Sequence, residues 1–148
     1  MNSALREQVS MPEVSGRKRI LVSAGLIQRP SDGRILVSKR LADAHLANSW
    51  EFPGGKVEFG EDPKNTVIRE LREELGIETS VGDIYAVGHH CYAEREVVLL
   101  VYQTAIIDGE PQCLEVADFA WLTPGEVVNL PLPPADQPVI DRLQRDCL

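Results

Sequence analysis

The sequence predicts one α+β domain in which strands and helices pack around a single core. Its 148 residues are 43 % apolar by composition, which is enough material for one globular core. Segments rich in Val, Ile and Leu lie on both sides of one amphipathic helical segment, and a second helical pattern ends the chain. The sequence contains no internal repeat and no interdomain linker.

The first residues differ from the rest of the chain. Residues 1–18 have no apolar period and lead into the basic run Arg17-Lys18-Arg19. Such a run is most often solvated. We therefore expect a flexible leader over residues 1–18 and the folded domain over residues 19–148.

Two strands are expected to open the domain. Residues 20–28 and 35–40 are rich in Ile, Val and Leu, and Pro30-Ser31-Asp32-Gly33 between them is a typical turn sequence. A further short strand is predicted at residues 57–59.

A helix is predicted over residues 63–75, and both of its ends are marked in the sequence. Asp62 is a suitable N-cap, Pro63 fits the first helical position, and Gly76 fits the C-terminal stop. One arc of this helix is apolar and is expected to be buried. It consists of Val67, Ile68, Leu71 and Leu75.

A second strand pair is expected after the helix, at residues 84–92 and 97–107, joined by a polar link. Residues 108–111 read as a turn, and residues 119–122 suit a final strand.

Two helices are expected to close the chain. Thr123 and Glu126 fit a capping box at the start of a short helix. The last helix is expected to begin near Asp136, with its apolar side chains facing inward. These are Val139, Ile140 and Leu143.

The predicted helix at residues 63–75 carries three acids on one side. Glu70, Glu73 and Glu74 stand at positions i, i+3 and i+4, so their side chains project together. Like charges this close repel unless a cation lies among them, and Mg²⁺ or Mn²⁺ suits an all-carboxylate site. The alternative is a solvated helix face with Glu–Arg pairs.

The spacing of these acids within a longer pattern resembles the Nudix box, G-x5-E-x7-R-E-U-x-E-E-x-G-U, in which U is a bulky aliphatic residue. Gly55, Glu61 and the segment from Arg69 to Ile77 meet every fixed position. The resemblance implies a Nudix-type α/β/α sandwich with a curved mixed sheet. It also implies metal-dependent hydrolysis of a nucleoside diphosphate linked to a further group.

Further segments resemble the MutT branch of that family. They are residues 39–56, which include Glu51-Phe52-Pro53-Gly54-Gly55-Lys56, and residues 133–140. The likeness covers about residues 20–143. It implies a Mg²⁺-dependent enzyme, with Mn²⁺ as a possible substitute, that attacks 8-oxo-(d)GTP at the β-phosphorus. The products would be the nucleoside monophosphate and pyrophosphate, and the role would be to keep oxidised nucleotides out of replication.

The resemblance also implies roles for individual residues in catalysis. Arg69 and Glu61 would orient the site through an ion pair. Either Glu115 or Glu74 would orient the attacking water, and this choice stays open. The metal ligands would be the carboxylates of Glu70, Glu73, Glu74 and Glu115 and a backbone carbonyl of Gly54 or Gly55.

Three further residues are candidates for contact with the nucleotide. Arg40 either contacts the base or is a charge at the end of a strand. Phe52 either stacks on the base, which is worth roughly 1–3 kcal/mol, or belongs to the core. Lys56 either meets a phosphate or is a surface cation.

Asp136 departs from the MutT pattern, which has asparagine at this position. An amide can both donate and accept, so it suits the O6 and protonated N7 of 8-oxoguanine. An ionised aspartate only accepts, and it would repel O6 unless burial keeps it protonated. Aspartate is a good acceptor for the exocyclic amine of cytosine. Alternatively, Asp136 is simply the N-cap of the last helix.

Composition limits the partners. The formal charge of −8 argues against binding to nucleic acid or to a membrane surface, and no segment is long and apolar enough to span a membrane. The spacing of Cys91, Cys113 and Cys147 suggests neither a zinc site nor a disulfide framework. We expect a cytoplasmic monomer acting on a small-molecule nucleotide.

Two other functions remain open at this stage. The first is a diphosphatase for CTP or modified pyrimidine nucleotides. The second is a catalytically silent Nudix module that senses a nucleotide, although such modules usually lack the box acids that are present here.

Overall fold

The computed structural model describes residues 18–44 and 46–148. The expectation of a flexible leader falls on residues 1–17 and so lies outside the described residues, but Lys18 already belongs to the first strand. No helix within the described ranges is long and apolar enough to cross a lipid bilayer.

The strands form two sheets, and the expected α+β class is confirmed. The larger sheet is mixed, with strand order β4-β1-β6-β5; β1 runs parallel to β6, whereas the other pairs are antiparallel. Its strands are β1 (Lys18–Ile27), β4 (Gly54–Lys56), β5 (Glu78–Cys91) and β6 (Arg95–Asp108). The smaller sheet is antiparallel and has the order β3-β2-β7. Its strands are β2 (Ile35–Lys39), β3 (Trp50–Glu51) and β7 (Asp118–Leu122).

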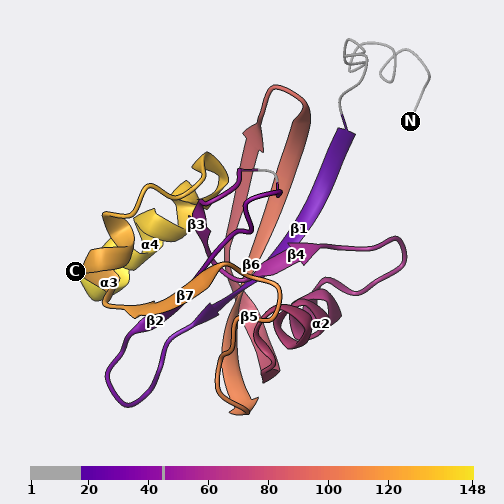
Figure 1. The fold of residues 1–148 in the computed structure, drawn as a ribbon. Coiled ribbons are helices and arrows are strands. Elements are labelled where there is room, and N and C mark those ends of the chain that lie inside the picture. The colour runs from indigo at the N-terminus through magenta and orange to yellow at the C-terminus, as the bar shows by residue number, and fades with distance from the viewer. Residues whose placement is uncertain (1–17, 45) are drawn as a thin grey trace, which may run out of the picture.

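Helices lie on two sides of these sheets, as Figure 1 shows. The helical elements are α2 (Pro63–Leu75), α3 (Pro124–Val128), the 3₁₀ turn η1 (Pro134–Asp136) and α4 (Gln137–Cys147). Two buried clusters hold them in place. Helix α2 packs into one cluster through Leu71 and Leu75, and α4 packs into the other through Val139 and Leu143. The helices therefore flank the strands, as the resemblance implied.

The local signals of α2 are confirmed. The Asp62 carboxylate accepts a hydrogen bond from the Lys64 N–H at 2.8 Å, and Gly76 ends the helix with φ of 69°. That positive φ favours glycine. The predicted buried arc needs one correction, because Ile68 is only partly buried and Thr66 is fully buried in its place.

The strand predicted at residues 57–59 is wrong, because the strand is β4, three residues earlier in the chain. β4 pairs with β1 through Gly54 and Ala24. A Cβ at Gly54 would lie only 2.2 Å from the Ser23 carbonyl oxygen, so only glycine permits this close pairing. Glycine has low strand propensity, which is why the sequence pattern missed the strand.

Strand β5 also begins earlier than expected, at Glu78 rather than at residue 84. Its pairing with β6 shifts register between Val81 and Ile84 and again before Ala86. Such irregularities break the alternation of apolar and polar residues on which strand prediction depends. The capping box at Thr123 and Glu126 is confirmed by reciprocal hydrogen bonds, and α4 directly follows Asp136.

Candidate active site

A cavity of about 340 Å³ opens between the mixed sheet, α2 and the segment that leads into α4. Most of the site residues expected from the sequence line it. They are Arg40, Phe52, Gly54, Gly55, Lys56, Glu70, Glu74, Glu115 and Asp136. Arg69 and Glu73 are not part of this lining.

One wall of the cavity is acidic, and α2 provides it. Glu70 and Glu74 are one turn apart and both face the cavity. Glu73 points elsewhere, with its side chain 46 % exposed. A Cβ at Gly55 would lie 2.3 Å from the Glu70 carboxyl carbon, so the carboxyl occupies the space that this glycine leaves open.

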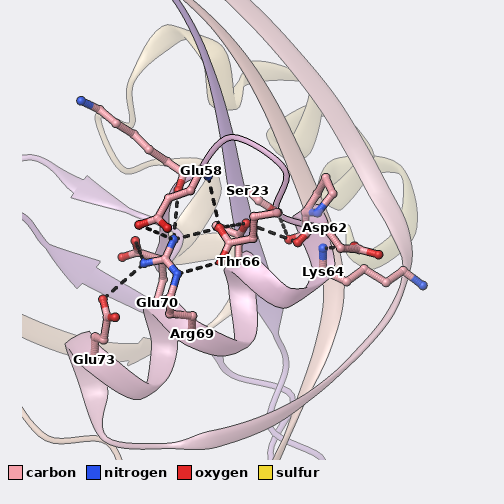
Figure 2. Close-up of polar contacts among 11 residues, drawn as sticks. Ser23, Glu58, Asp62, Lys64, Thr66, Arg69, Glu70 and Glu73 are labelled. Carbon is pink, nitrogen blue, oxygen red and sulfur yellow. Dashed lines mark hydrogen bonds and ion pairs between the residues drawn. The ribbon is translucent and has the colours of Figure 1, made fainter.

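Arg69 holds the outer side of this acidic wall, and Figure 2 shows its guanidinium among the surrounding carboxylates. Its Nε donates to Glu61 Oε2 at 2.8 Å and its Nη1 donates to Glu70 Oε1 at 2.9 Å. A weaker contact of 3.4 Å reaches Glu73, and Nη2 donates to the Lys56 carbonyl at 3.2 Å. Arg69 therefore ties the loop after β4 to α2 and fixes the orientation of Glu70.

Glu61 is the strongest partner of Arg69. Hydrogen bonds from Arg69 and then from Thr66 lower the pKa of Glu61 to about 2. The hydrogen bond with Glu61 in turn raises the pKa of Arg69. This pair stays ionised throughout the physiological range.

Glu74 is in a different environment. Its Oε2 is buried and has no hydrogen-bond partner in the part of the chain that the structure describes. Burial, and then the charges of Glu70 and Glu51, raise the pKa of Glu74 to about 10, and burial also raises the pKa of Glu70. An unsatisfied carboxylate oxygen beside another carboxylate is a fit for a hard divalent cation, which would supply the missing positive charge.

Glu115 reaches the same wall from the loop before β7. The backbone N–H groups of Leu114 and Glu115 both donate to the Glu74 carbonyl at 3.1 Å. These bonds fix the loop on the C-terminal turn of α2, and the Glu115 side chain lines the cavity. Glu70, Glu74 and Glu115 are the acids on the cavity lining that could hold a metal ion, together with a carbonyl of Gly54 or Gly55. Their carboxylate oxygens do not all lie within 4.8 Å of one another in this structure, so a bound ion would have to draw them together.

A second polar group on the cavity lining consists of Arg40, Glu51 and Asp136, and Glu51 is near enough to the acidic wall for its charge to raise the pKa of Glu74. Arg40 Nη1 donates to Glu51 Oε2 at 2.7 Å, while the buried Arg40 Nε has no partner among the described residues. Burial raises the pKa of Glu51, and the Arg40 charge opposes this rise. Arg40 is therefore paired and partly buried rather than a free charge at a strand end.

Asp136 lies at the end of this group and is only 4 % exposed. Burial, and then the nearby charge of Glu51, raise its pKa to about 7. Its side chain makes no capping hydrogen bond to α4. Asp136 thus occupies the N-cap position of α4, as one interpretation expected, but its side chain does not cap the helix and the residue lines the cavity.

Phe52 and Lys56 also line the cavity. Phe52 is 3 % exposed and belongs to the core cluster under α4, although one part of it lines the cavity. Phe52 therefore belongs to the core, as one interpretation expected, and little of its ring is available for stacking on a base, which stays a prediction. Lys56 is exposed at the cavity edge, where its ammonium group is free to reach a bound anion.

Sequence reasoning missed three polar residues that line the cavity, namely Glu51, Tyr92 and Arg95. Glu51 was noticed only as part of a matched segment. The available signal was its place as the first residue of the Glu-Phe-Pro-Gly-Gly segment. Tyr92 and Arg95 flank the tight link between β5 and β6, where the sequence showed only a polar connection.

Comparisons with known proteins agree with this geometry. The family described as NUDIX domain matches residues 19–143. The 8-oxo-dGTP diphosphatase of Escherichia coli (strain K12) is 35 % identical over 128 residues, which cover 86 % of this chain and 98 % of that protein. The CTP pyrophosphohydrolase of the same organism is 40 % identical over 124 residues, covering 84 % of this chain and 90 % of that protein.

A solved structure matches the fold. The crystal structure of the MutT protein from Methanosarcina mazei Go1 is 25 % identical and superposes with a TM-score of 0.80, covering 90 % of this chain and 98 % of that chain. The acidic wall, the motif and the matched family agree. The chain therefore belongs to the Nudix family and is a Nudix pyrophosphohydrolase, an enzyme that acts on phosphoanhydrides.

Proposed function

We propose that this enzyme is a Mg²⁺-dependent nucleoside triphosphate pyrophosphohydrolase of the MutT type. Its substrate is 8-oxo-(d)GTP, which it converts to the monophosphate and pyrophosphate, and its role is to keep oxidised nucleotides out of replication. One observation carries the proposal: a single cavity is lined both by the acidic wall of Glu70 and Glu74 and by Asp136, whose pKa is about 7. The first suits a metal-bound triphosphate and the second suits a base.

The acidic wall supports hydrolysis. Glu70, Glu74 and Glu115, with a carbonyl of Gly54 or Gly55, would hold the cation, with Mg²⁺ as the natural ion and Mn²⁺ as a substitute. Glu73, exposed in this structure, would join them by a side-chain rotation. When bound, the ion neutralises phosphate charge and lowers the pKa of bound water. Lys56 at the cavity edge would contact the phosphates.

Between the two carboxylates considered as general base, Glu115 is the better candidate. A base must be ionised before it can take a proton from water. Without a cation, Glu74 has a pKa of about 10 and so holds its own proton at neutral pH. A bound cation would displace that proton and make the buried Glu74 a ligand, while Glu115 is exposed and accessible to water, so we assign the orientation of the attacking water to Glu115.

The Asp136 environment supports recognition of 8-oxoguanine. With a pKa of about 7, a large fraction of Asp136 is the neutral acid at neutral pH, and this acid both donates and accepts one hydrogen bond. It can donate to O6 and accept from the protonated N7. Unmodified guanine offers acceptors at both positions, so one pair would be lost, at a cost of about 1–3 kcal/mol.

Cytosine is a second candidate base, and the same carboxyl favours it. The neutral acid can donate to N3 and accept from the exocyclic amine, and the ionised form can still accept from that amine. The similarity to a CTP pyrophosphohydrolase supports this alternative. A catalytically silent module is not supported, because Glu70 and Glu74 both face the cavity.

The proposal includes a monomer that acts on free nucleotides in the cytoplasm rather than on nucleic acid. The formal charge of −8 supports this, since nucleic-acid binding relies on a basic surface.

A nucleotide panel tests the proposal. Turnover of 8-oxo-dGTP, dGTP, CTP and dCTP is measured with Mg²⁺ as pyrophosphate release, and the nucleotide product is identified. We expect the highest kcat/KM for 8-oxo-dGTP, with pyrophosphate as product and no turnover in EDTA. A higher kcat/KM for the cytosine nucleotides would replace the first candidate with the second. Release of inorganic phosphate instead of pyrophosphate would contradict both.

A further inference from the structure

A second group of metal-ligand side chains lies on the outer face of the β5–β6 hairpin. It consists of His89, Cys91 and Glu96, whose ligand atoms all lie within 4.8 Å of one another. Cys91 pairs directly with Glu96 across the two strands, and His89 precedes Cys91 by two residues. Residues two apart in a strand share a face, so the hairpin itself brings the three side chains together.

This face is separate from the cavity. The neighbouring residues Tyr92 and Val97 line the cavity, and successive side chains in a strand point to opposite faces. His89, Cys91 and Glu96 therefore lie on the opposite face of the sheet from Val97, at the hairpin end of β5 and β6. The imidazole is 55 % exposed and Cys91 is also exposed, so an ion from solvent can reach both.

The distances suit a tetrahedral ion after a small adjustment. His89 Nε2 lies 2.9 Å from Glu96 Oε2, and Cys91 Sγ lies 3.9 Å from the same oxygen. Bond lengths to zinc of about 2.0–2.3 Å require neighbouring donor atoms to be about 3.3–3.8 Å apart. Shifts of under about 1 Å in exposed side chains would produce this arrangement, with water as the fourth ligand.

Glu96 is already oriented for this role. Its Oε1 accepts from Arg19 Nε, which leaves Oε2 directed toward His89 and Cys91. Arg19 thus holds the ligand as an outer partner does in many metal sites, although its charge opposes a cation.

We propose that His89, Cys91 and Glu96 form a second metal site, which takes a thiophilic divalent ion such as Zn²⁺. A thiolate and an imidazole favour such an ion over Mg²⁺, which prefers oxygen ligands. The spacing of the cysteines gave no sign of this site, because two of its three ligands are not cysteines. A bound ion would fasten the end of β5 to the start of β6, next to the cavity residues Tyr92 and Arg95.

Cobalt titration tests the site. Co²⁺ is added to the full-length protein in a thiol-free reducing buffer that contains excess Mg²⁺ to occupy the acidic wall. Coordination by a thiolate gives a sulfur-to-cobalt charge-transfer band in the near ultraviolet, which oxygen ligands cannot produce. We expect this band to saturate at one Co²⁺ per chain and to disappear on addition of one equivalent of Zn²⁺.

Variants identify the ligands. Cys91→Ser is expected to abolish the band, and His89→Ala to weaken Co²⁺ binding by at least about tenfold. Cys113→Ser is the matched control, because Cys113 is also an exposed free cysteine but lies outside this group, and it is expected to leave the band unchanged. Circular dichroism checks that each variant is folded.

Two results would overturn the proposal. One is the absence of a charge-transfer band in the unmodified protein at micromolar Co²⁺. The other is a band of normal intensity in folded Cys91→Ser, which would assign the thiolate to another cysteine.

Discussion

The acidic wall and the group of Arg40, Glu51 and Asp136 both bury carboxyl groups in the cavity, but they differ in what compensates the buried negative charge. Each group contains carboxyl groups whose pKa values burial raises, Glu70 and Glu74 in the acidic wall and Glu51 and Asp136 in the other group. At the acidic wall the groups face one another, and the unsatisfied Glu74 Oε2 calls for an external cation. In the other group, the Arg40 guanidinium compensates the charge of Glu51. Asp136 has no such cation among the described residues, and its buried carboxyl becomes neutral by taking up a proton. This difference indicates that the acidic wall is suited to a metal ion, whereas the surroundings of Asp136 are suited to an uncharged nucleobase.

The largest effect is expected from Glu74→Gln. It removes a metal-ligand charge from the acidic wall, so kcat should fall by about 10³-fold, equivalent to several kcal/mol of transition-state stabilisation. Steady-state kinetics over a Mg²⁺ series measure this change. Glu110→Gln is the control, since Glu110 is exposed outside the cavity. A near-normal rate at saturating Mg²⁺ would remove Glu74 from the metal site.

The same variant gives a stability test with a defined sign. Because the pKa of Glu74 is raised from 4.5 to about 10 in the folded state, folding favours the protonated acid. The stability from Glu74 is therefore present below about pH 4.5 and declines as pH rises toward 10. In EDTA, Glu74→Gln should have a higher Tm than the unmodified protein at pH 8. A lower Tm would show that Glu74 is ionised and satisfied without metal.

The next largest effect is expected from Gly55→Ala. The added Cβ would lie 2.3 Å from the Glu70 carboxyl carbon and would push this ligand away. A displacement of about 1 Å can cost about 10²-fold in rate, and we expect a loss of that size in kcat. Gly60→Ala is a useful comparison, because nothing lies within 4 Å of its Cβ position, although its φ of 79° brings some strain. Equal rates for the two variants would contradict a role for the Gly55 opening.

Arg69→Lys tests the role of the hydrogen bonds and ion pairs that the Arg69 guanidinium makes. Lysine cannot donate to Glu61, Glu70 and the Lys56 carbonyl at once, so kcat should fall by about 10–100-fold with the fold retained. The stability from Glu61 is present above about pH 4.5 and is lost as pH falls toward 2. Acid unfolding followed by circular dichroism should therefore begin at higher pH in this variant. An unchanged acid midpoint would mean that Glu61 does not depend on Arg69.

The smallest effect is expected in the other group, from Asp136→Asn. Asparagine donates and accepts at every pH, whereas Asp136 loses its proton as pH rises through about 7. Ionised Asp136 can no longer donate to O6, so kcat/KM for 8-oxo-dGTP in the unmodified enzyme should fall by about tenfold relative to the variant between pH 6 and pH 8.5. The ratio of kcat/KM values measures this, with the Mg²⁺ dependence as an internal control that should not change. The same pH response in both proteins would exclude Asp136 from base recognition.

The acidic wall could be predicted from sequence because its determinants are local. Asp62, Gly76 and the spacing of Glu70 and Glu74 define a helix and one of its faces within a short segment. The group of Arg40, Glu51 and Asp136 depends on contacts between distant parts of the chain. The pKa of Asp136 depends on burial and on Glu51, and neither is visible in the residues around position 136.

The same distinction explains the errors in the fold. β4 was misplaced because a Gly-Gly segment has no strand pattern, and it pairs only because β1 lies beside it. The exposure of Glu73 could not be foreseen either. Helical spacing groups it with Glu70 and Glu74, but its contact with Arg69 turns it away from the cavity.

The parallel pairing of β1 with β6 also affects how the protein is made. Arg19 meets Glu96 across 77 positions of sequence, and β1 lies at the centre of the larger sheet. During synthesis, β1 cannot pair with β6 until β6 has left the ribosome. Closing the long loop between these two strands slows folding. Nascent chains that stop before β6 should therefore bind chaperones and be readily degraded by proteases, however stable the finished enzyme is.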